Sequence, residues 1–208
     1  MGLISNLKPL LAGALIAVSM PVAAALAAPQ IGKPAPDFSG VDSKGNTVKL
    51  SELRGRTVIL EWTNHDCPYV KKHYRTQNMQ SLQKDAADQG LVWLSIISSA
   101  PGLQGHVSGK AADELTVSRD AAPNSVVLDP EGTIGRLYDA RTTPHMYIIK
   151  PDGILAYKGA IDDRPTANDA DVKKAMNYVK NAVSQLNNGK PVSPAVTRAY
   201  GCSIKYAS

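Results

Sequence analysis

Cys67 lies where the sequence changes from a strand pattern to a helix pattern. It follows the apolar run at residues 58–60 and directly precedes Pro68. Proline is favoured at the first position of a helix, because its missing N–H group would have no partner there. We therefore expect the Cys67 thiol to lie beside the free N–H groups of a helix N-terminus, which stabilise a thiolate. Since the thiolate is the reactive form, the pattern predicts a nucleophilic cysteine.

The residues just before Cys67 are polar where a structural strand would stay apolar. Thr63, Asn64 and His65 occupy this stretch, followed by Asp66. The alternative interpretation of Cys67, a small buried hydrophobe, is common for a single cysteine but explains neither the helix start nor these neighbours. We expect Thr63, Asn64 and His65 to hydrogen-bond a substrate.

The second sulfur is not where a helix-borne dithiol would place it. In a C-x-x-C motif the partner lies three residues on, and that position is Val70; the only other cysteine is Cys202. Cys202 has two interpretations: a permanent clasp that fastens the end of the chain, or a resolving thiol that attacks a sulfenic acid or mixed disulfide at Cys67. We favour the resolving thiol, because Gly201 gives the neighbouring backbone freedom to move.

The N-terminal segment has the composition of a secretory signal peptide. It carries one charged residue, Lys8, then an apolar run, then the small-residue pattern that signal peptidases accept at residues 25–27. A retained membrane anchor is the alternative, but Pro9 and Pro21 bracket a run shorter than the about 20 residues that span a bilayer. We predict a signal peptide cleaved after Ala27 and a periplasmic or secreted protein, a location in which disulfides persist.

Charge and hydropathy limit the kinds of protein that the rest of the chain can form. The net charge is +5 over all 208 residues, and no basic block stands out. No second apolar run is long enough to cross a membrane. We therefore predict one soluble domain at residues 28–189 with a C-terminal tail at 190–208, and neither nucleic acid nor a membrane as its partner.

Apolar periodicity predicts alternating strands and helices. Two short strands that flank a turn are expected within residues 37–50, and further strands at 57–63, 91–97, 125–128, 146–149 and 154–160. Helices are expected at 68–87, 108–119, 133–138 and 169–186. The last two strands are joined by a tight turn, which predicts an antiparallel hairpin. This order predicts an α/β fold with a mixed central sheet and helices on both faces.

Two long segments carry a resemblance to a known family. They are VILEWTNHDCPYV at residues 58–70 and TTPHMYIIKPDGILAYKGAIDD at 142–163, and the leader IGKPAPDF at 31–38 adds to them. Together they resemble the thioredoxin-like superfamily and, within it, the alkyl hydroperoxide reductase and thiol-specific antioxidant (redoxin) family, in the peroxiredoxin-like branch with CPYV or CPFV at the active site. The resemblance covers residues 31–186 and implies a thioredoxin-like fold with an N-terminal β-hairpin extension.

The resemblance gives a role to the segment before the strand at 146–149. Thioredoxin-like proteins carry a cis proline in the loop that faces the active cysteine, and Thr143-Pro144 matches that position. Thr143 would then offer its backbone groups to an extended substrate, with Pro144 and His145 beside it. An ordinary turn proline is the alternative interpretation.

The chain also departs from the peroxiredoxin pattern P-x-x-x-T-x-x-C. Leu60 stands at the proline position and Asn64 at the threonine position, with Thr63 one residue earlier. Arg141 resembles the family arginine that approaches the thiolate, and a surface charge is its alternative interpretation. These departures leave the preference between peroxide and disulfide open.

Together these residues predict an exported thiol oxidoreductase of the redoxin type with antioxidant activity. The Cys67 thiolate attacks a peroxide or a protein disulfide, and Cys202 resolves the product into an intramolecular disulfide. A thiol reductant, whose identity the sequence leaves open, reopens that bond. No cofactor is predicted.

The alternative is a copper-binding or non-catalytic thioredoxin-like protein with a structural Cys67–Cys202 disulfide. Besides Cys67, its soft ligands would be His65, His73, His145 and Met146. His73 follows Cys67 by six residues, which turns it about 120° around a helix and away from the thiol. A solvated helix position is its other interpretation, so catalysis is favoured over copper.

Overall fold

The computed structural model describes residues 1–2 and 28–207. The predicted signal peptide therefore lies outside the described residues, apart from Met1 and Gly2. In the part that is described, no helix is both long and apolar enough to cross a membrane.

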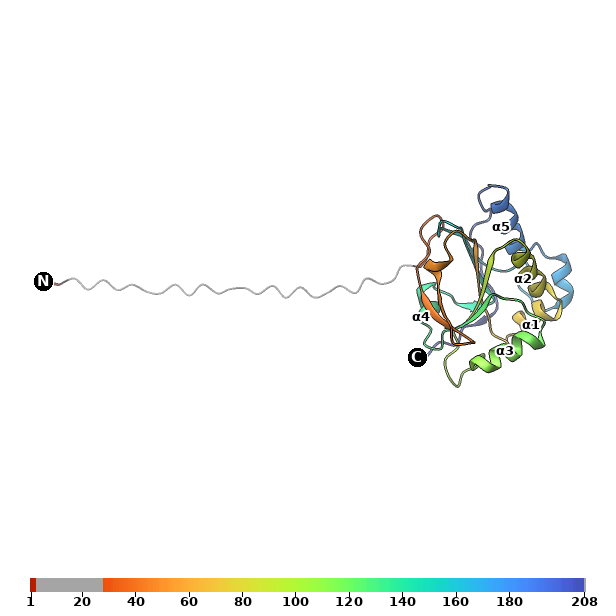
Figure 1. Cartoon of the computed structure of the whole chain (residues 1–208), viewed down its shortest axis with the longest axis horizontal. Helices are drawn as coiled ribbons and strands as arrows, with labels where there is room; N and C mark the ends of the chain where they lie inside the picture. Colours follow the sequence, from red (N-terminus) through yellow and green to blue (C-terminus); the bar gives the residue numbers. More distant parts are fainter. Residues whose placement is uncertain (3–27, 208) are drawn as a thin grey trace.

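A seven-stranded mixed sheet forms the centre of the domain (Figure 1), with the strand order β2-β1-β5-β4-β3-β7-β8. The strands span Ser39–Asp42 (β1), Thr47–Lys49 (β2), Val58–Trp62 (β3), Val92–Ile97 (β4), Ser125–Leu128 (β5), His145–Ile149 (β7) and Leu155–Gly159 (β8). β3, β4 and β5 are parallel, whereas β7 runs antiparallel to β3 and β8, and β1 antiparallel to β5 and β2. The predicted mixed sheet and both predicted hairpins are confirmed.

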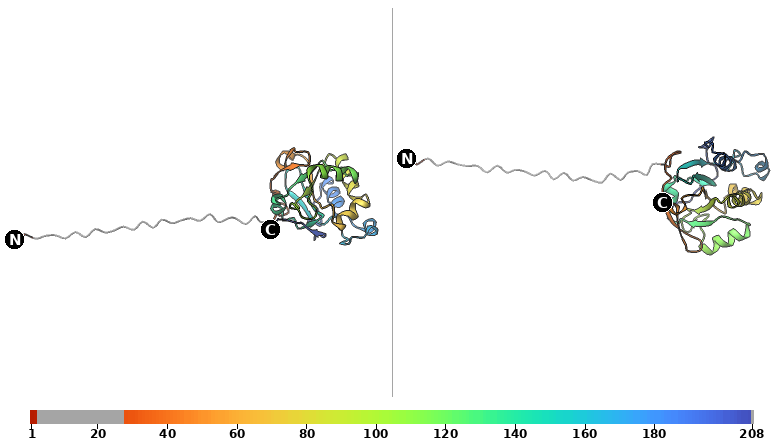
Figure 2. Two further views of the ribbon diagram at one scale, coloured as in Figure 1. Left: turned by 90° about the horizontal axis from the view of Figure 1, so that it is seen from below. Right: turned by 45° about the horizontal axis from the view of Figure 1, so that its top comes forward.

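Helices lie on both faces of this sheet, as the sequence predicts. Four are on one face: α1 (Pro68–Arg75), α2 (Asn78–Asp88), α3 (Gly109–Ser118) and α5 (Tyr178–Asn187). Figure 1 shows them together to the right of the strands, with α4 (Thr133–Leu137) on the opposite side, and Figure 2 turns the same arrangement by 90° and by 45°. Two 3-10 helices, η1 (Leu50–Leu53) and η2 (Asp169–Lys174), are also present.

The central strands are buried because layers cover both of their faces. Every residue of β3 and β4 is buried, which explains why their sequences are mostly apolar, with Glu61 and Ser95 as the polar exceptions. Side chains of β3 alternate between two cores, with Leu60 and Trp62 in one and Ile59 in the other, where Cys67 also lies. Since β3 leads directly into the turn that carries Cys67, this packing determines where the thiol lies.

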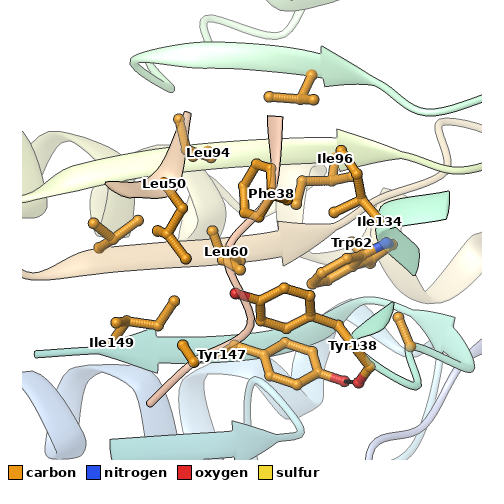
Figure 3. Packing of buried hydrophobic residues seen from close by; sticks show 14 of the residues in the cluster. Phe38, Leu50, Leu60, Trp62, Leu94, Ile96, Ile134, Tyr138, Tyr147 and Ile149 are labelled. Carbon is orange, nitrogen blue, oxygen red and sulfur yellow. Dashed lines mark hydrogen bonds between the residues drawn. The ribbon is translucent and has the colours of Figure 1, made fainter. Parts of the chain in front are cut away.

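The core on the α4 side is aromatic (Figure 3). The ring of Trp62 lies 5.4 Å from that of Tyr138 and 5.1 Å from that of Tyr147. The Tyr147 hydroxyl donates to the Tyr138 carbonyl at 2.8 Å, and Trp62 Nε1 donates to Ser98 Oγ at 3.0 Å. The polar atoms of these buried rings therefore have partners, and the end of β3 is held firmly before the turn that carries Cys67.

The predicted helix at 68–87 is wrong in one respect, because it is divided into α1 and α2. Gln77 adopts a left-handed backbone with a φ of 61°, which no regular helix allows. After this turn α2 packs Met79 and Leu82 into the same core as Val70 of α1. The two helices share an apolar face, and that is why their spacing resembled one helix.

The predicted helix at 169–186 is wrong over its first half. Residues there form the 3-10 helix η2, and the backbone then extends at Ala175 with a ψ of 142°. Asn177 begins α5 by accepting from the Lys180 N–H through its side chain, a strong N-cap. Met176, expected in the apolar stripe, is exposed.

The C-terminal tail folds back over the domain. It first runs beside β8, where the Lys158 N–H donates to the Ala195 carbonyl at 3.0 Å and the Thr197 N–H donates to the Lys158 carbonyl at 3.1 Å. It then forms the short strand β9 (Cys202–Ser203), which pairs antiparallel with β6 (Thr142–Thr143). Figures 1 and 2 show the C-terminal end lying against the domain. The pairing carries Cys202 into the body of the protein.

Candidate active site

Cys67 is the N-cap residue of α1, with Pro68 at the start of the helix. Its backbone is extended, with φ −69° and ψ 123°, and its carbonyl accepts the first helical hydrogen bond, from the Lys71 N–H at 2.8 Å. The thiol thus lies at a helix N-terminus, as the sequence predicts. The side chain has no exposed surface.

Cys202 lies directly against Cys67. The Cys202 N–H points at Cys67 Sγ, 3.4 Å away, although 135 residues separate the two in sequence. The Cys67 thiol in turn donates to the Thr143 carbonyl at 3.2 Å, and Thr143 is the partner of Cys202 in the β6–β9 pair. Both cysteines are free thiols, Cys67 buried and Cys202 half-buried.

This contact also affects the protonation of Cys202. Burial raises the pKa of Cys202 to about 12, and its hydrogen bond and charge interaction with Cys67 act in the same direction. At neutral pH Cys202 therefore keeps its proton.

The peptide bond between Thr143 and Pro144 is cis, as the family resemblance implies. The resemblance also implies that the Thr143 backbone binds an extended substrate. In this structure Cys202 of β9 is paired there instead. The tail of the same chain therefore occupies the edge of β6 at which the resemblance places a substrate segment.

The three polar residues before Cys67 do not hydrogen-bond its sulfur, and within the described residues the buried Thr63 hydroxyl has no hydrogen-bond partner. Asn64 shapes the turn, since its side-chain oxygen accepts from the Asp66 N–H at 2.9 Å and its carbonyl accepts from the Cys67 N–H at 3.1 Å. Thr63 and His65 line a small cavity of about 30 Å³ that extends towards α3. His65 Nε2 lies 3.3 Å from the Asp66 carboxylate, and burial lowers the pKa of His65. Substrate contacts by these residues stay predictions.

The side chains of His145 and Arg141 form contacts with residues other than the two cysteines. Arg141 is exposed and forms an ion pair with Asp139, with Nε 3.0 Å from Oδ1, so its interpretation as a surface charge is the one that fits. His145 is buried, with its ring 4.6 Å from that of Tyr147. Burial lowers the pKa of His145 to about 4, so the ring is neutral at pH 7.

Two observations bear on the copper interpretation. Across residues 1–2 and 28–207, no group of three or more His, Cys, Asp or Glu side chains is arranged to hold a metal ion. His73, one of the predicted ligands, is buried between two other side chains. Its Nδ1 lies 2.9 Å from Asn78 Nδ2 and its Nε2 lies 3.3 Å from the Tyr200 hydroxyl.

Sequence reasoning missed two buried polar networks near Cys67. One contains Lys72 and His73 of α1, which meet Asp162 and the tail residue Tyr200. A helical lysine and histidine normally indicate a solvated face, and no local pattern pairs them with residues about 90 and 130 positions away. Only the path of the tail reveals this network.

The other network centres on Glu61 of β3. Its carboxylate accepts from Trp93 Nε1 and Ser95 Oγ, each at 2.9 Å, and from the Tyr74 hydroxyl at 3.1 Å. Burial raises the pKa of Tyr74 well above its ordinary value, so the phenol stays a donor. The buried carboxylate is thus well supplied with donors, as burial of a charge requires. Tyr74 ties α1, the helix that begins at Cys67, to the sheet.

A cavity of about 500 Å³ opens beside the β6–β9 pair. Thr142 of β6, Gly201 of the tail and Asp162 are among the residues that line it. Its size lies in the range of small-molecule and side-chain pockets. Neither cysteine is among its lining residues, so the cavity lies beside the tail strand and not at the thiols themselves.

Solved structures similar to this chain agree with the fold. Two cover 86% of it at a TM-score of 0.72: a hypothetical protein from Sinorhizobium meliloti 1021, with 23% identity over 96% of that chain, and an uncharacterized conserved protein from Geobacillus kaustophilus, with 24% identity over 93% of that chain. The thioredoxin domain of a thiol-disulfide oxidoreductase from Bacteroides vulgatus matches 70% of this chain and 96% of its own, with 20% identity and a TM-score of 0.50. These likenesses show a thioredoxin-like fold.

The sequence itself decides the family. No curated protein matches it, but the model of the AhpC/TSA family matches residues 31–158. That region is more than half of the chain and includes Cys67 and Thr143-Pro144. With its thioredoxin-like fold and a cysteine at the start of α1, the chain belongs to the AhpC/TSA family.

Proposed function

We propose that the protein is a thiol oxidoreductase in which Cys67 attacks the substrate and Cys202 resolves the product. One observation carries the proposal: two free thiols meet at a helix N-terminus, with the Cys202 N–H 3.4 Å from Cys67 Sγ. Membership of the AhpC/TSA family supports thiol-based redox chemistry. A peroxide and a disulfide both suit this pair of thiols.

The first step uses Cys67 alone. With a peroxide, the thiolate attacks one oxygen, an S–O bond forms and the O–O bond breaks. Sulfur is oxidised to the sulfenic acid, and the peroxide is reduced to an alcohol or water after taking up a proton. With a disulfide substrate, the thiolate attacks one sulfur, a mixed disulfide forms and the other sulfur leaves as a thiolate.

The second step brings in Cys202, which gives up its proton as it attacks the Cys67 sulfur. From the sulfenic acid the new S–S bond forms and water leaves; from the mixed disulfide the substrate thiol leaves. Both routes end in a Cys67–Cys202 disulfide. A thiol reductant must then supply two electrons to restore the two thiols.

Export is part of the proposal. The composition of residues 1–27 supports a signal peptide and a periplasmic or secreted location. An oxidised Cys67–Cys202 pair would persist there.

Mass spectrometry of the reduced protein after one equivalent of hydrogen peroxide, or of a dialkyl disulfide, tests the mechanism. The native chain should lose two hydrogens as the disulfide forms. Cys202→Ser should stop at the sulfenic acid or mixed disulfide on residue 67, whereas Cys67→Ser should do neither. Full turnover by Cys67→Ser would end the proposal, and a disulfide that a mild reductant cannot open would show a structural clasp instead.

A further inference from the structure

The hydroxyl of Tyr200 connects the tail to a buried cluster of charged and polar side chains. The Tyr200 O–H donates to Asp162 Oδ1, and Lys72 Nζ donates to the Tyr200 oxygen at 3.2 Å. His73 Nε2 lies 3.3 Å from the same oxygen. Because Asn78 Nδ2 donates to His73 Nδ1 at 2.9 Å, the ring proton belongs on Nε2 and points at Tyr200. The phenol oxygen thus accepts two hydrogen bonds and donates one.

Tyr200 bridges a buried ion pair whose other hydrogen bonds come from the Arg164 backbone. The Arg164 carbonyl accepts from Lys72 Nζ at 3.0 Å, and the Arg164 N–H donates to Asp162 Oδ1 at 2.9 Å. Lys72 is 0% exposed and Asp162 is 2% exposed, and Lys72 Nζ lies 3.9 Å from Asp162 Oδ2. That distance is too long for a direct hydrogen bond, and the Tyr200 hydroxyl bridges the two ions. A buried ion pair is tolerated only where further hydrogen bonds satisfy both partners. Removing the hydroxyl therefore weakens the hold of the cluster on the tail.

The ring of Tyr200 is also held by α1. It packs edge-on against Tyr69, with the ring centroids 5.8 Å apart, and Lys72 Nζ lies 5.2 Å from its centroid. Both contacts come from the helix that begins at Cys67. Tyr200 is therefore placed relative to Cys67, and only Gly201 separates it from Cys202.

We propose that Tyr200 is the positioning residue that seats Cys202 on Cys67, with Lys72, His73 and Asp162 as the clamp that holds it. This inference rests on the proposed function and concerns its second step. After a peroxide has oxidised Cys67, the Cys202 sulfur attacks, the S–S bond forms and the S–O bond breaks. The departing hydroxide takes the Cys202 proton and leaves as water. Tyr200 sets how often the thiol is in place for this attack.

The test is a time course of the reduced full chain mixed with hydrogen peroxide, quenched with a thiol-blocking reagent and analysed by mass. The thiol, sulfenic acid and disulfide forms are then counted separately. Tyr200→Phe keeps the ring and removes the hydroxyl. It should form the sulfenic acid at least as fast as the native chain, because a looser tail exposes Cys67 more often. It should convert the sulfenic acid to the disulfide about tenfold more slowly or worse, as loss of a hydrogen bond to charged groups implies. The sulfenic acid should accumulate.

Tyr206→Phe is the matched control in the same tail. The Tyr206 hydroxyl donates to the Ala140 carbonyl at 2.7 Å, and its ring lies over Arg136. This variant loses one tail hydrogen bond outside the clamp, and disulfide formation should stay within about twofold of native. Lys72→Met, which keeps the length of the side chain and removes its charge, should slow the same step as Tyr200→Phe.

The outcomes separate the inference from the proposed function. If Cys67 is oxidised but neither Tyr200→Phe nor Lys72→Met slows disulfide formation, the clamp is wrong and the proposed function stands. If Tyr206→Phe slows it as much as Tyr200→Phe, general loosening of the tail explains the effect and the clamp is again wrong. If the native Cys67 is not oxidised by peroxide or disulfide, the proposed function itself fails.

Discussion

Cys67 combines a reactive position with complete burial. The Cys202 N–H and the Thr143 carbonyl occupy the hydrogen-bonding positions around its sulfur, and the thiol has no exposed surface. A small peroxide needs only a slight opening to reach it. A protein disulfide needs β9 to leave β6. If Cys67 attacks substrates as we propose, the residues that seat the tail control which of them reach the thiol.

Gly201 is the residue most sensitive to substitution in this contact. Its φ is +135°, which L side chains rarely adopt, and a Cβ there would collide with the Thr143 carbonyl group. Gly201→Ala should lower the free energy of unfolding of the reduced protein by about 1–3 kcal/mol and slow disulfide formation. Urea denaturation and the oxidation time course measure both effects.

Gly189→Ala is the control for this substitution. Gly189 also has a positive φ, +66°, but nothing lies within 4 Å of a Cβ at that position. Gly189→Ala should lower the free energy of unfolding by only about 1–2 kcal/mol, which is the cost of placing an L residue in the left-handed region. It should leave the rate of disulfide formation unchanged. Equal disulfide kinetics in the two variants would show that Gly201 has no special role.

Among the elements, α1 has the most demanding position. It must begin at Cys67, place Lys72 and His73 beneath the tail, and stop early enough for α2 to return to the sheet. The turn at Gln77, with its φ of 61°, achieves the stop. Val70 before the turn and Met79 after it then share one core.

The turn between α1 and α2 predicts a stabilising substitution. Gln77 is exposed and adopts a left-handed conformation, which costs an L residue about 1–2 kcal/mol. Glycine avoids this steric cost, although it loses more backbone entropy on folding. Gln77→Gly should therefore raise the free energy of unfolding by up to about 1 kcal/mol. Ser81→Gly, at an exposed right-handed position inside α2, should instead lower it by about 0.5 kcal/mol. Urea denaturation of both variants measures these two changes. Destabilisation by Gln77→Gly would contradict the view that Gln77 is strained by its left-handed conformation.

For the whole molecule, buried neutral histidines make stability depend on pH. Burial lowers the pKa of His73 to about 3, with the Lys72 charge acting in the same direction, and burial lowers the pKa of His145 to about 4. In the unfolded chain both should titrate near 6.5. Below that pH the unfolded state binds protons that the folded state does not, so the free energy of unfolding falls as pH falls from 6.5 towards 4.

The expected loss is about 2 kcal/mol for each of the two histidines between pH 7 and pH 5. Urea denaturation at the two pH values measures it. His73→Gln should remove about half of the pH dependence, because it leaves His145 in place. Equal stability of the native protein at pH 7 and pH 5 would contradict the burial of both rings as neutral groups.

Much of the fold can be predicted because the signals are local. Continuous apolar runs predict β3 and β4, turn residues predict the two hairpins, and Pro68 directly after Cys67 predicts the start of α1. The cis bond before Pro144 follows from the family resemblance. The helix boundaries at Gln77 and Asn177 were missed because the apolar spacing continues across both breaks, and periodicity alone does not report a change of backbone direction.

The sequence by itself determined the cysteine at the start of a helix, the α/β order and the presence of a second thiol in a tail. Only the tertiary structure decided that the tail crosses to β6, that Cys202 meets Cys67, and that Arg141 is a surface charge. Tyr200 illustrates the reason. Its hydroxyl is held by Lys72, His73 and Asp162, and each looks solvated when its own neighbours in sequence are considered alone. A side chain's partners depend on how distant segments pack, and that information is not present in any one stretch of the chain.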